Sequence, residues 1–591
     1  MKHARALVTL VIGKYFQSLW EKHCRPNWEQ YAARHDANVI VLDVPLDSSP
    51  RAQARQASWQ KLLILGQPQV RDYAQVVWLD ADILIHPRAA WVGDTVPMEL
   101  IGVTDEYEYP TRELNFRALT RLYRLWEKHN IRFARNATPR EFYTLAGFDK
   151  TFDRATQSGV MVLNPQRHRA ILEHVYHNHE QGNLGGINGE MRPLSYELLS
   201  ANLVHWLAPQ WNAIWWFEKA VSFPFLLLEN ESPLLSACAT HALAKNFLLH
   251  FAGLQDELRA VDLTSRLLDE PPRLLHASPP PLPPPQCQSP VALFLFQRPE
   301  TTARVMDAIR AVRPRELYLV ADGPRANVPE DAARCAQARE IALQVDWECA
   351  VKTHFAETNL GLRARVESGL NWLFEQVEEA IILEDDCIPD VTFFRFCDET
   401  LERFRDDARV FMISGNDFKF GLDAQNSYTF SRYPLIWGWA TWRRAWLKND
   451  ATMQTFPRAL RSNRLGEMLG DTRAAQYWAF TLQQHFRTRT TWDYTWLWSI
   501  WENNGLCVHP NTNLVENAGF GADATHTLDS ENLFAEMLKS HMDFPLQHPP
   551  RVERNAESDA LIEDIAFSGS LRRLWKRVRA QRAGPAAPAG L

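Results

Sequence analysis

The stretch VVWLDADILIHP, residues 76–87, is an apolar run interrupted by two aspartates, Asp80 and Asp82. Its first part has the length and composition of a buried strand, and the acids come where that strand ends. Carboxylates are rarely buried without a partner, because removing an ion from water costs several kcal/mol. The stretch therefore predicts a sheet whose strand ends carry charge, with a cation facing the two acids.

A second stretch, AIILEDDCIPD at residues 380–390, repeats this arrangement with Glu384, Asp385 and Asp386. Ligands of open parallel sheets bind beyond the carboxyl ends of the strands. Neighbouring carboxylates at such an end suit a hard divalent cation, Mg²⁺ or Mn²⁺, which usually also binds substrate phosphates. The alternative is that the acids are solvated and only serve the following turn.

Both halves of the chain open with the same alternation of elements. The first half reads as a strand ALVTLVIG, a helical stretch and a strand NVIVLDV; the second reads as VALFLFQRP, the helical ETTARVMDAIRAV and ELYLVADGPR. Strands that alternate with helices favour parallel pairing. We expect the α/β class, with two Rossmann-like domains built on mostly parallel sheets.

A chain of 591 residues is too long for one hydrophobic core. The clearest boundary is SPPPLPPPQCQSP at residues 278–290, since consecutive prolines favour an extended, stiff backbone. The predicted organisation is an N-terminal domain at 1–272, a linker at 273–290, a C-terminal domain at 291–545 and a tail at 546–591.

Composition narrows the class of protein. A hydrophobic content of 46%, 23% charged residues and a net charge of −7 are typical of a globular protein and give no sign of nucleic-acid binding. The basic start MKHAR is not followed by the apolar run of a signal peptide or membrane helix. The eight cysteines lack metal-finger spacing. We expect a cytoplasmic protein.

The first half resembles the GT-A glycosyltransferases, in which WLDADILIHP would be the DxD segment. The resemblance implies that Asp80 and Asp82 hold a metal ion on the diphosphate of a nucleotide-sugar. QSGVMVLNP (157–165) is similar to a strand that lines the donor sugar, and NFLLHFAG (246–253) to a segment whose histidine completes the metal site, although a histidine in an apolar run is also typical of a core. The residues implied are Ser158 and Asn164 for the donor, His250 for the metal and Lys61 for donor phosphate.

The second half, over most of residues 289–530, resembles bacterial family-2-like glycosyltransferases and, in its EDD, N-acetylglucosaminyltransferase I. FLFQRPETT and VADGPR are similar to the nucleotide-binding start of these enzymes, which implies that Arg298 and Asp322 contact the base or ribose. ETNLGLRARVESGLNWLF resembles the helix beside the diphosphate, with Asn359 and Gly361 at its start.

The same resemblance assigns roles around the EDD. Asp386 would be the direct metal ligand, with Glu384 and Asp385 on the ribose and sugar. TWDYTWLWSIW is similar to the segment that carries the catalytic base, here Asp493, and NAGFGADATHT would close over the diphosphate, with His526 on phosphate or metal.

The residues themselves support parts of this chemistry. A carboxylate positioned to take the proton of an acceptor hydroxyl contributes about 10²–10⁴-fold, and aromatic neighbours would raise the pKa of Asp493 toward usefulness. The alternative for Asp493 is a helix cap. The first half shows no comparable base, which favours a retaining reaction there. Trp437 and Trp439 would offer flat walls to an acceptor sugar, the alternative being core packing.

The interpretation is a bifunctional, metal-dependent glycosyltransferase that acts on a glycan or lipid-linked acceptor, in bacterial surface polysaccharide synthesis. One alternative is a phosphohydrolase in which Asp80 and Asp82 form the aspartyl-phosphatase motif; another is a non-catalytic glycan-binding protein. Residues 571–582 combine an apolar helix face with six basic residues, which is typical of weak contact with an anionic membrane surface. The alternatives are a helix that packs back on the C-terminal domain and a frayed basic tail.

Overall fold

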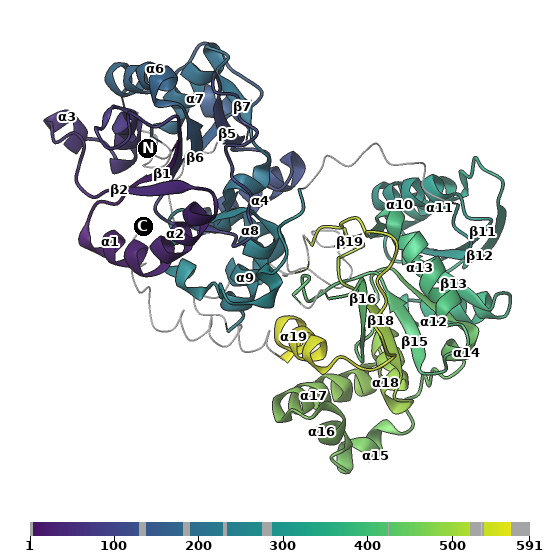
Figure 1. Ribbon diagram of the computed structural model, residues 1–591. Coiled ribbons are helices and arrows are strands. Elements are labelled where there is room, and N and C mark those ends of the chain that lie inside the picture. Colours follow the sequence, from purple (N-terminus) through teal and green to yellow (C-terminus); the bar gives the residue numbers. More distant parts are fainter. Residues whose placement is uncertain are drawn as a thin grey trace. The chain divides into compact units, whose positions relative to one another are not determined.

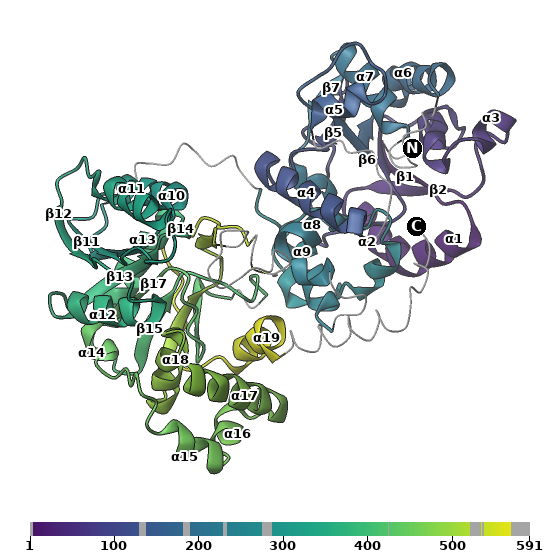
Figure 2. The ribbon, with the colours of Figure 1, turned by 180° about the vertical axis from the view of Figure 1, so that it is seen from behind.

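The computed structural model describes residues 4–128, 138–180, 189–227, 233–274, 286–422, 425–519, 534 and 537–568. The chain folds as two compact units, Met1–Ser278 and Pro279–Ala587 (Figure 1). Seen from behind, each unit again shows a sheet flanked by helices (Figure 2). The α/β class expected from the sequence is confirmed.

Unit 1 contains a six-stranded sheet and a smaller three-stranded one. Its strands are β1 Arg5–Leu10, β2 Ala37–Leu42, β3 Gln75–Leu79, β4 Ile83–Ile85, β5 Ile101–Asp105, β6 Thr156–Leu163, β7 Val204–Trp206, β8 Ala213–Ile214 and β9 Leu248–His250. Its helices are α1 Lys14–Leu19, α2 Arg25–Arg34, α3 Pro50–Gln53, α4 Arg112–Lys128, α5 Pro139–Thr144, α6 Pro165–Asn178, α7 Met191–Ser200, α8 Trp215–Ser222 and α9 Leu235–Lys245.

The large sheet of unit 1 has the order β2-β1-β3-β6-β5-β7. Pairings of β1 with β2 and β3, and of β5 with β7, are parallel, whereas β6 runs antiparallel to both β3 and β5. Because β6 is reversed, its first residues lie beside the last residues of β3, with Leu79 opposite Val160. This reversal brings the start of β6 to the edge that carries Asp80.

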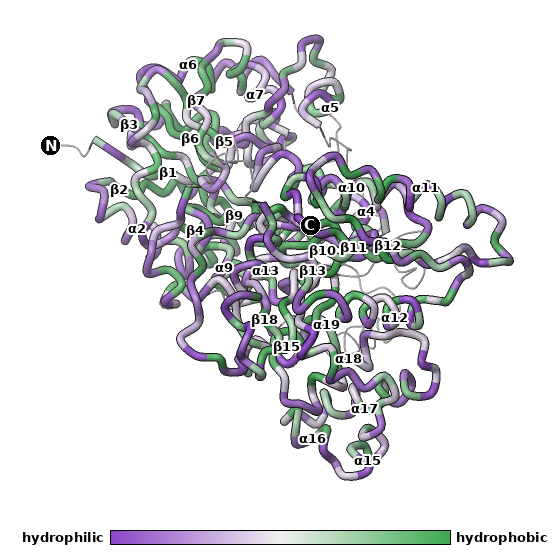
Figure 3. The backbone as a smooth tube through the Cα atoms, turned by 90° about the vertical axis from the view of Figure 1, so that its right-hand side faces the viewer, coloured by the Kyte–Doolittle hydropathy of each residue, from purple (hydrophilic) through white to green (hydrophobic). Residues whose placement is uncertain are grey.

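Helices cover both faces of this sheet. On one face a 3-10 helix at Ala57–Gly66 packs with α6 and α7 against alternate strand residues such as Val76 and Trp78. On the other face α2 contacts β1 and β2. Figure 3 shows the apolar colouring along the central strands. The 3-10 helix matters for function because it carries Lys61.

Unit 2 is built on an eight-stranded sheet and a two-stranded ribbon. Its strands are β10 Val291–Leu295, β11 Glu316–Ala321, β12 Ala350–Phe355, β13 Glu379–Glu384, β14 Cys387–Pro389, β15 Val410–Ser414, β16 Tyr428–Ser431, β17 Trp439–Trp442, β18 Leu506–Pro510 and β19 Val515–Asn517. Its helices are α10 Pro299–Val312, α11 Asp331–Leu343, α12 Leu362–Phe374, α13 Val391–Arg403, α14 Arg443–Trp446, α15 Phe456–Arg461, α16 Arg464–Leu469, α17 Thr472–Thr488, α18 Asp493–Glu502 and α19 Ala556–Ala566.

The sheet of unit 2 has the order β12-β11-β10-β13-β17-β15-β18-β16. The first four strands are parallel, so the ends of β10, β11 and β13 meet at one edge. Val291 and Leu293 of β10 face α10, α11 and α13, whereas Ala292 and Phe294 face α12, α17 and α18. This alternation is the reason why an apolar run such as VALFL forms a strand buried on both faces.

The boundaries differ from those expected. The linker is shorter than 273–290, because Cys287 is buried in the core of unit 2 and the carbonyl of Arg273 accepts a hydrogen bond from Gln210 in unit 1. The C-terminal unit does not end at 545, because Leu546 and Ile562 are buried in its core. The part of the expected tail at 546–568 therefore belongs to unit 2.

Two further features bear on the sequence analysis. All eight cysteines are free thiols. Among the described residues, no helix combines the length and the apolar character needed to cross a bilayer. The basic stretch 571–582 lies outside the described residues, so its expected contact with an anionic membrane stays a prediction.

Candidate active sites

The first acid cluster lies where two sheets of unit 1 meet. Strand β3 ends at Leu79, and the N–H of Asp80 donates to the carbonyl of Gly159. Strand β4 then pairs antiparallel with β9, which sets His250 opposite Ile83. As a result, the Nε2 atom of His250 lies 3.2 Å from Oδ1 of Asp82 and 3.8 Å from Oδ2 of Asp80.

Neighbouring groups fix the ring of His250. Its Nδ1 atom lies 3.0 Å from Oδ1 of Asn212, whose amide nitrogen donates to Gln157. A Cβ atom at Gly159 would come within 2.6 Å of Cε1 of His250, so glycine leaves the space for the ring. With Nδ1 directed at an amide oxygen, the ring would present the lone pair of Nε2 to a bound metal ion once Nε2 has lost its proton, as in histidines that bind metals. Carboxylates and an imidazole are ligand types that suit a divalent cation.

Lys61 supplies the cation that the apolar run and its acids predicted. Its Nζ atom lies 2.8 Å from Oδ1 of Asp80 and 3.3 Å from Oε1 of Glu190, and donates to Ser158 at 3.4 Å. The Lys61 and Glu190 side chains are only 3% and 4% exposed. Of the donor residues expected in unit 1, Lys61 and Ser158 therefore lie together beside Asp80.

The charges of this cluster sustain one another. Burial opposes ionisation of Lys61, but Asp80 and Glu190 raise its pKa. Burial likewise acts against ionised Asp82, but the adjacent His250 lowers the pKa of that carboxyl. The pKa of His250 is raised by Asp82 against the effect of burial. The cluster thus combines three carboxylates with two cationic groups of the chain.

The second acid cluster lies at the meeting strand ends of unit 2. The N–H of Phe296, after β10, donates to Oδ2 of Asp385 at 2.8 Å. Nη1 of Arg298 lies 3.2 Å from Oδ1 of Asp385 and also forms an ion pair with Asp386. Here too a cation of the chain faces the acids, as the sequence predicted. The guanidinium of Arg298 contacts the EDD turn directly.

Negative charge dominates this second cluster. Burial and then Asp386 raise the pKa values of Glu384 and Asp385. Arg298 acts in the other direction on both, and the N–H of Phe296 also lowers the pKa of Asp385. Asp493, the first residue of α18, adds to the rise at Glu384. The charge of the expected base therefore acts on an acid of the EDD turn. Carboxylate oxygens are the ligand type that a hard divalent cation prefers.

Asp322, Asn359 and Gly361 form one turn at the same sheet edge. The carboxylate of Asp322 accepts hydrogen bonds from the side chain of Asn359 and from the N–H groups of Leu360 and Gly361. Gly361 has φ +80°, a conformation that favours glycine, and precedes α12. The three expected residues lie together, and Asp322 acts on the shape of this turn.

Other expected site residues lie elsewhere. Asn164 caps α6 at the far end of β6, remote from Asp80, so its expected donor contact is wrong. Trp439 is 1% exposed and stacks on Trp492 in the core, which excludes acceptor stacking. Trp437 is half-buried against Phe418 and stays a candidate. His526 falls outside the described residues.

Some residues of the first site escaped sequence reasoning. Glu190 precedes α7 and accepts hydrogen bonds from Ser58 and Ser158, and Asn212 supports His250. Glu106 follows β5 at the same edge, where burial and Asp105 raise its pKa to about 8. For Glu190 the only signal in the sequence is an acid at the start of a helical pattern. Asn212 and Glu106 have no signal in the sequence around them.

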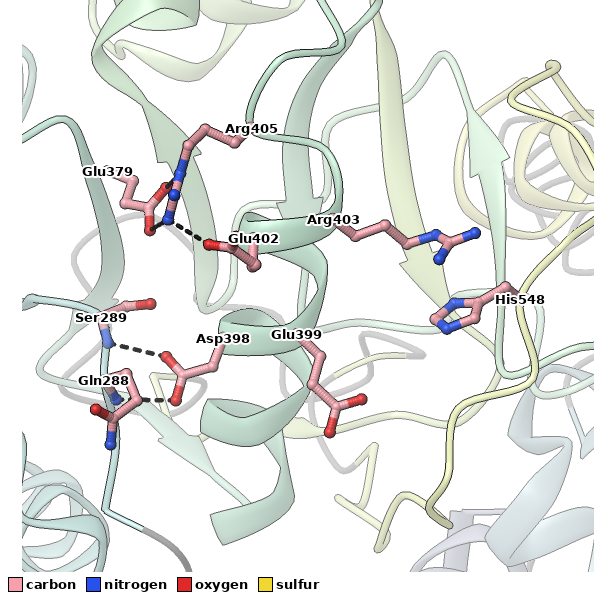
Figure 4. A pocket seen from close by; sticks show the side chains of 9 residues that line it. All are labelled: Gln288, Ser289, Glu379, Asp398, Glu399, Glu402, Arg403, Arg405 and His548. Carbon is pink, nitrogen blue, oxygen red and sulfur yellow. Dashed lines mark hydrogen bonds and ion pairs between the residues drawn. The ribbon is translucent and has the colours of Figure 1, made fainter.

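A separate pocket of 560 Å³ lies in unit 2 (Figure 4). It contains Glu379, the first residue of β13, so it lies at the sheet edge opposite the EDD turn. Asp398 accepts from the N–H groups of Gln288 and Ser289, and Arg405 pairs with Glu379 and Glu402. Because these charges already serve the packing of unit 2, we assign the pocket no ligand.

No protein-family model matches the chain, and no curated protein matches it. Similar solved structures include a glycosyltransferase involved in the glycosylation of the major capsid of PBCV-1, with 13% identity over 44% of this chain and 100% of that one and a TM-score of 0.27. The bifunctional glycosyltransferase WbbM is 14% identical over 44% of this chain and 49% of its own, with a TM-score of 0.26. The galactosyltransferase LgtC is 12% identical over 42% of this chain and 87% of its own, with a TM-score of 0.24. These values are too low to carry an argument about activity, which must rest on the sites.

Proposed function

We propose that each unit transfers a sugar from a nucleotide-diphosphate sugar to a glycan or lipid-linked acceptor, with Mn²⁺ or Mg²⁺ as cofactor. Asp80, Asp82 and His250 would hold the ion in unit 1, and Asp386 would hold it in unit 2. The observation that supports the proposal is that Nε2 of His250, whose ring is held by Asn212, lies 3.2 Å from an oxygen of Asp82 and 3.8 Å from an oxygen of Asp80. The bound ion would supply Lewis-acid charge to the diphosphate leaving group.

In unit 1 the chain's own groups would bind and orient the donor. The buried ammonium of Lys61 offers fixed positive charge next to Asp80, where donor phosphate would lie. Its low exposure keeps that charge poorly solvated and therefore effective. With no base comparable to Asp493 expected in this unit, we propose a retaining transfer here.

In unit 2 Arg298 and the turn of Asn359 and Gly361 would position the nucleotide diphosphate. Asp493 would take the proton of the acceptor hydroxyl as that oxygen attacks the sugar, which gives an inverting transfer. The effect of the Asp493 charge on the pKa of Glu384 supports this role. We place both reactions in the cytoplasm, in the synthesis of a bacterial surface polysaccharide.

A panel of nucleotide-sugars with Mn²⁺ tests the proposal. We expect release of nucleoside diphosphate from at least one donor, and loss of that release in EDTA. Release of inorganic phosphate from a phosphomonoester would instead support a phosphohydrolase. Glycan binding without turnover of any donor would support a glycan-binding protein, and either result would overturn the proposal.

A further inference from the structure

A group of metal-ligating side chains lies away from both acid clusters, at the ends of α6 and α7 in unit 1. His174 and His179 come from the last turn and end of α6, and Glu197 comes from α7. One ligand atom from each residue lies within 4.8 Å of the others. Within the described ranges, no other three histidine, cysteine or acidic residues have ligand atoms that all lie within 4.8 Å of one another.

The geometry points to a zinc site. Nε2 of His179 lies 2.8 Å from Oε1 of Glu197, and Nε2 of His174 lies 3.9 Å from the same oxygen. We propose that these three residues bind one Zn²⁺. Two imidazole nitrogens and one carboxylate oxygen are a frequent zinc donor set, which leaves the fourth position to water.

Groups around the three ligands hold them in place. The side-chain amide of Asn178 lies 3.0 Å from Nδ1 of His174, the ring nitrogen remote from Glu197. The contacting atom is the amide nitrogen, which also donates to the carbonyl of His174 at 2.9 Å. Zinc at Nε2 would place a proton on Nδ1 and would therefore require this amide to rotate. The carbonyl of His179 accepts hydrogen bonds from Arg51 and Arg55, which fix the end of α6.

Exposure suits an exchangeable ion. The side chains of His179 and Glu197 are 21% and 22% exposed, and that of His174 is 50% exposed. An ion can therefore reach the site from solvent without opening of the fold. A bound ion would also link α6 to α7. Glu190, which pairs with Lys61, immediately precedes α7.

Zinc titration of the full chain tests the site. After EDTA treatment and in excess Mg²⁺, we expect the chain to bind one equivalent of Zn²⁺ at His174, His179 and Glu197, as measured by calorimetry. His174→Gln and His179→Gln should each lower the affinity for that zinc ion by at least about 10²-fold, since even loss of a group that supports a ligand costs about 10–100-fold in metal affinity.

Two controls separate this site from other histidines. His177→Gln changes an exposed histidine of the same helix that is outside the group and should bind zinc as the unaltered chain does. Asp80→Ala with Asp82→Ala should retain the equivalent as well. His174 is exposed, so His174→Gln is decisive even if His179→Gln unfolds. Zinc binding that is unchanged in His174→Gln would overturn the proposal.

Discussion

The two acid clusters look alike as sequence motifs but differ in charge balance. In unit 1, Lys61 and His250 face Asp80, Asp82 and Glu190, and the pKa values of Asp82 and Glu190 are lowered. In unit 2, Arg298 is the one cation among the described residues that forms an ion pair with the EDD turn, through Asp385 and Asp386, and its charge also acts on Glu384.

The difference appears in the pKa values of unit 2. Burial and mutual repulsion raise the pKa values of Glu384 and Asp385, which favours proton uptake by this turn. The acid clusters of the two units, although similar as sequence motifs, therefore differ in the balance of charge around them. We expect the second site to depend more on an added cation.

The strongest test of two separate sites is to remove the acid pair of each unit in turn. Asp80→Ala with Asp82→Ala should abolish one transfer activity, and Asp385→Ala with Asp386→Ala the other. We expect losses of about 10³-fold or more, since the proposed ion contributes several kcal/mol to the transition state. Donor-specific release of nucleoside diphosphate measures both, and each variant is the control for the other. Loss of both activities in one folded variant would contradict two independent sites.

The next largest effect concerns the base proposed for unit 2 only. Asp493→Asn keeps the shape of the side chain but cannot take a proton at neutral pH, so kcat should fall by about 10²-fold or more with little change in donor affinity. Asp471→Asn is the matched control, because Asp471 caps α17 and asparagine caps equally well. Near-normal turnover of Asp493→Asn would leave Asp493 a structural residue of α18.

A smaller effect tests the histidine that distinguishes unit 1. In Gly159→Ala the new Cβ would lie 2.6 Å from Cε1 of His250 and displace the ring. We expect Mn²⁺ affinity at unit 1 to fall about 10–100-fold, as for loss of a supporting group, with unit 2 unaffected. In Gly66→Ala the added atom would meet the ends of the Arg169 and Glu173 side chains, which makes it the control. Equal Mn²⁺ binding in both variants would remove His250 from the metal site.

The smallest effect is a pH dependence of unit 2 without metal. The pKa of Glu384 rises from 4.5 to about 8, chiefly through burial. Between these values the folded state holds a proton that the unfolded state has lost, so stability falls as pH rises, by about 1.4 kcal/mol per pH unit for each such proton. Hydrogen exchange in peptides from β13, between pH 5 and 8, measures this slope. Glu384→Gln should flatten it, and a flat profile in the unaltered protein would contradict the charge imbalance.

The sequence predicted what is local. An apolar run followed by acids was enough to place β3 and β13 and their charged ends, because burial and strand length are properties of the run itself. The facing cation was predictable in kind but not in every contact. Glu190 reaches Ser158 across 32 residues of chain, and only the packing of α7 on the sheet brings them together.

The tryptophan pair shows a second limit. Trp437 and Trp439 are two residues apart, yet one is half-buried in a loop and the other is buried at the start of β17. Composition treats the two alike, since both indole rings suit a sugar or a core. The place where a strand begins decides between them, and strand ends are the least certain part of any reading of a sequence.

Helix α19 has a consequence for how the protein is made. Asp559 accepts hydrogen bonds from Ser431 and Arg432, and Glu563 accepts from Tyr433 and Trp478, so these central groups are satisfied from the far end of the chain. During synthesis unit 1 can fold as soon as it leaves the ribosome, since domains generally fold as units. Unit 2 must wait until residues near 563 emerge, with its tryptophan-rich core incomplete until then. We therefore expect the second half of the chain to stay incompletely folded for longer during synthesis than the first.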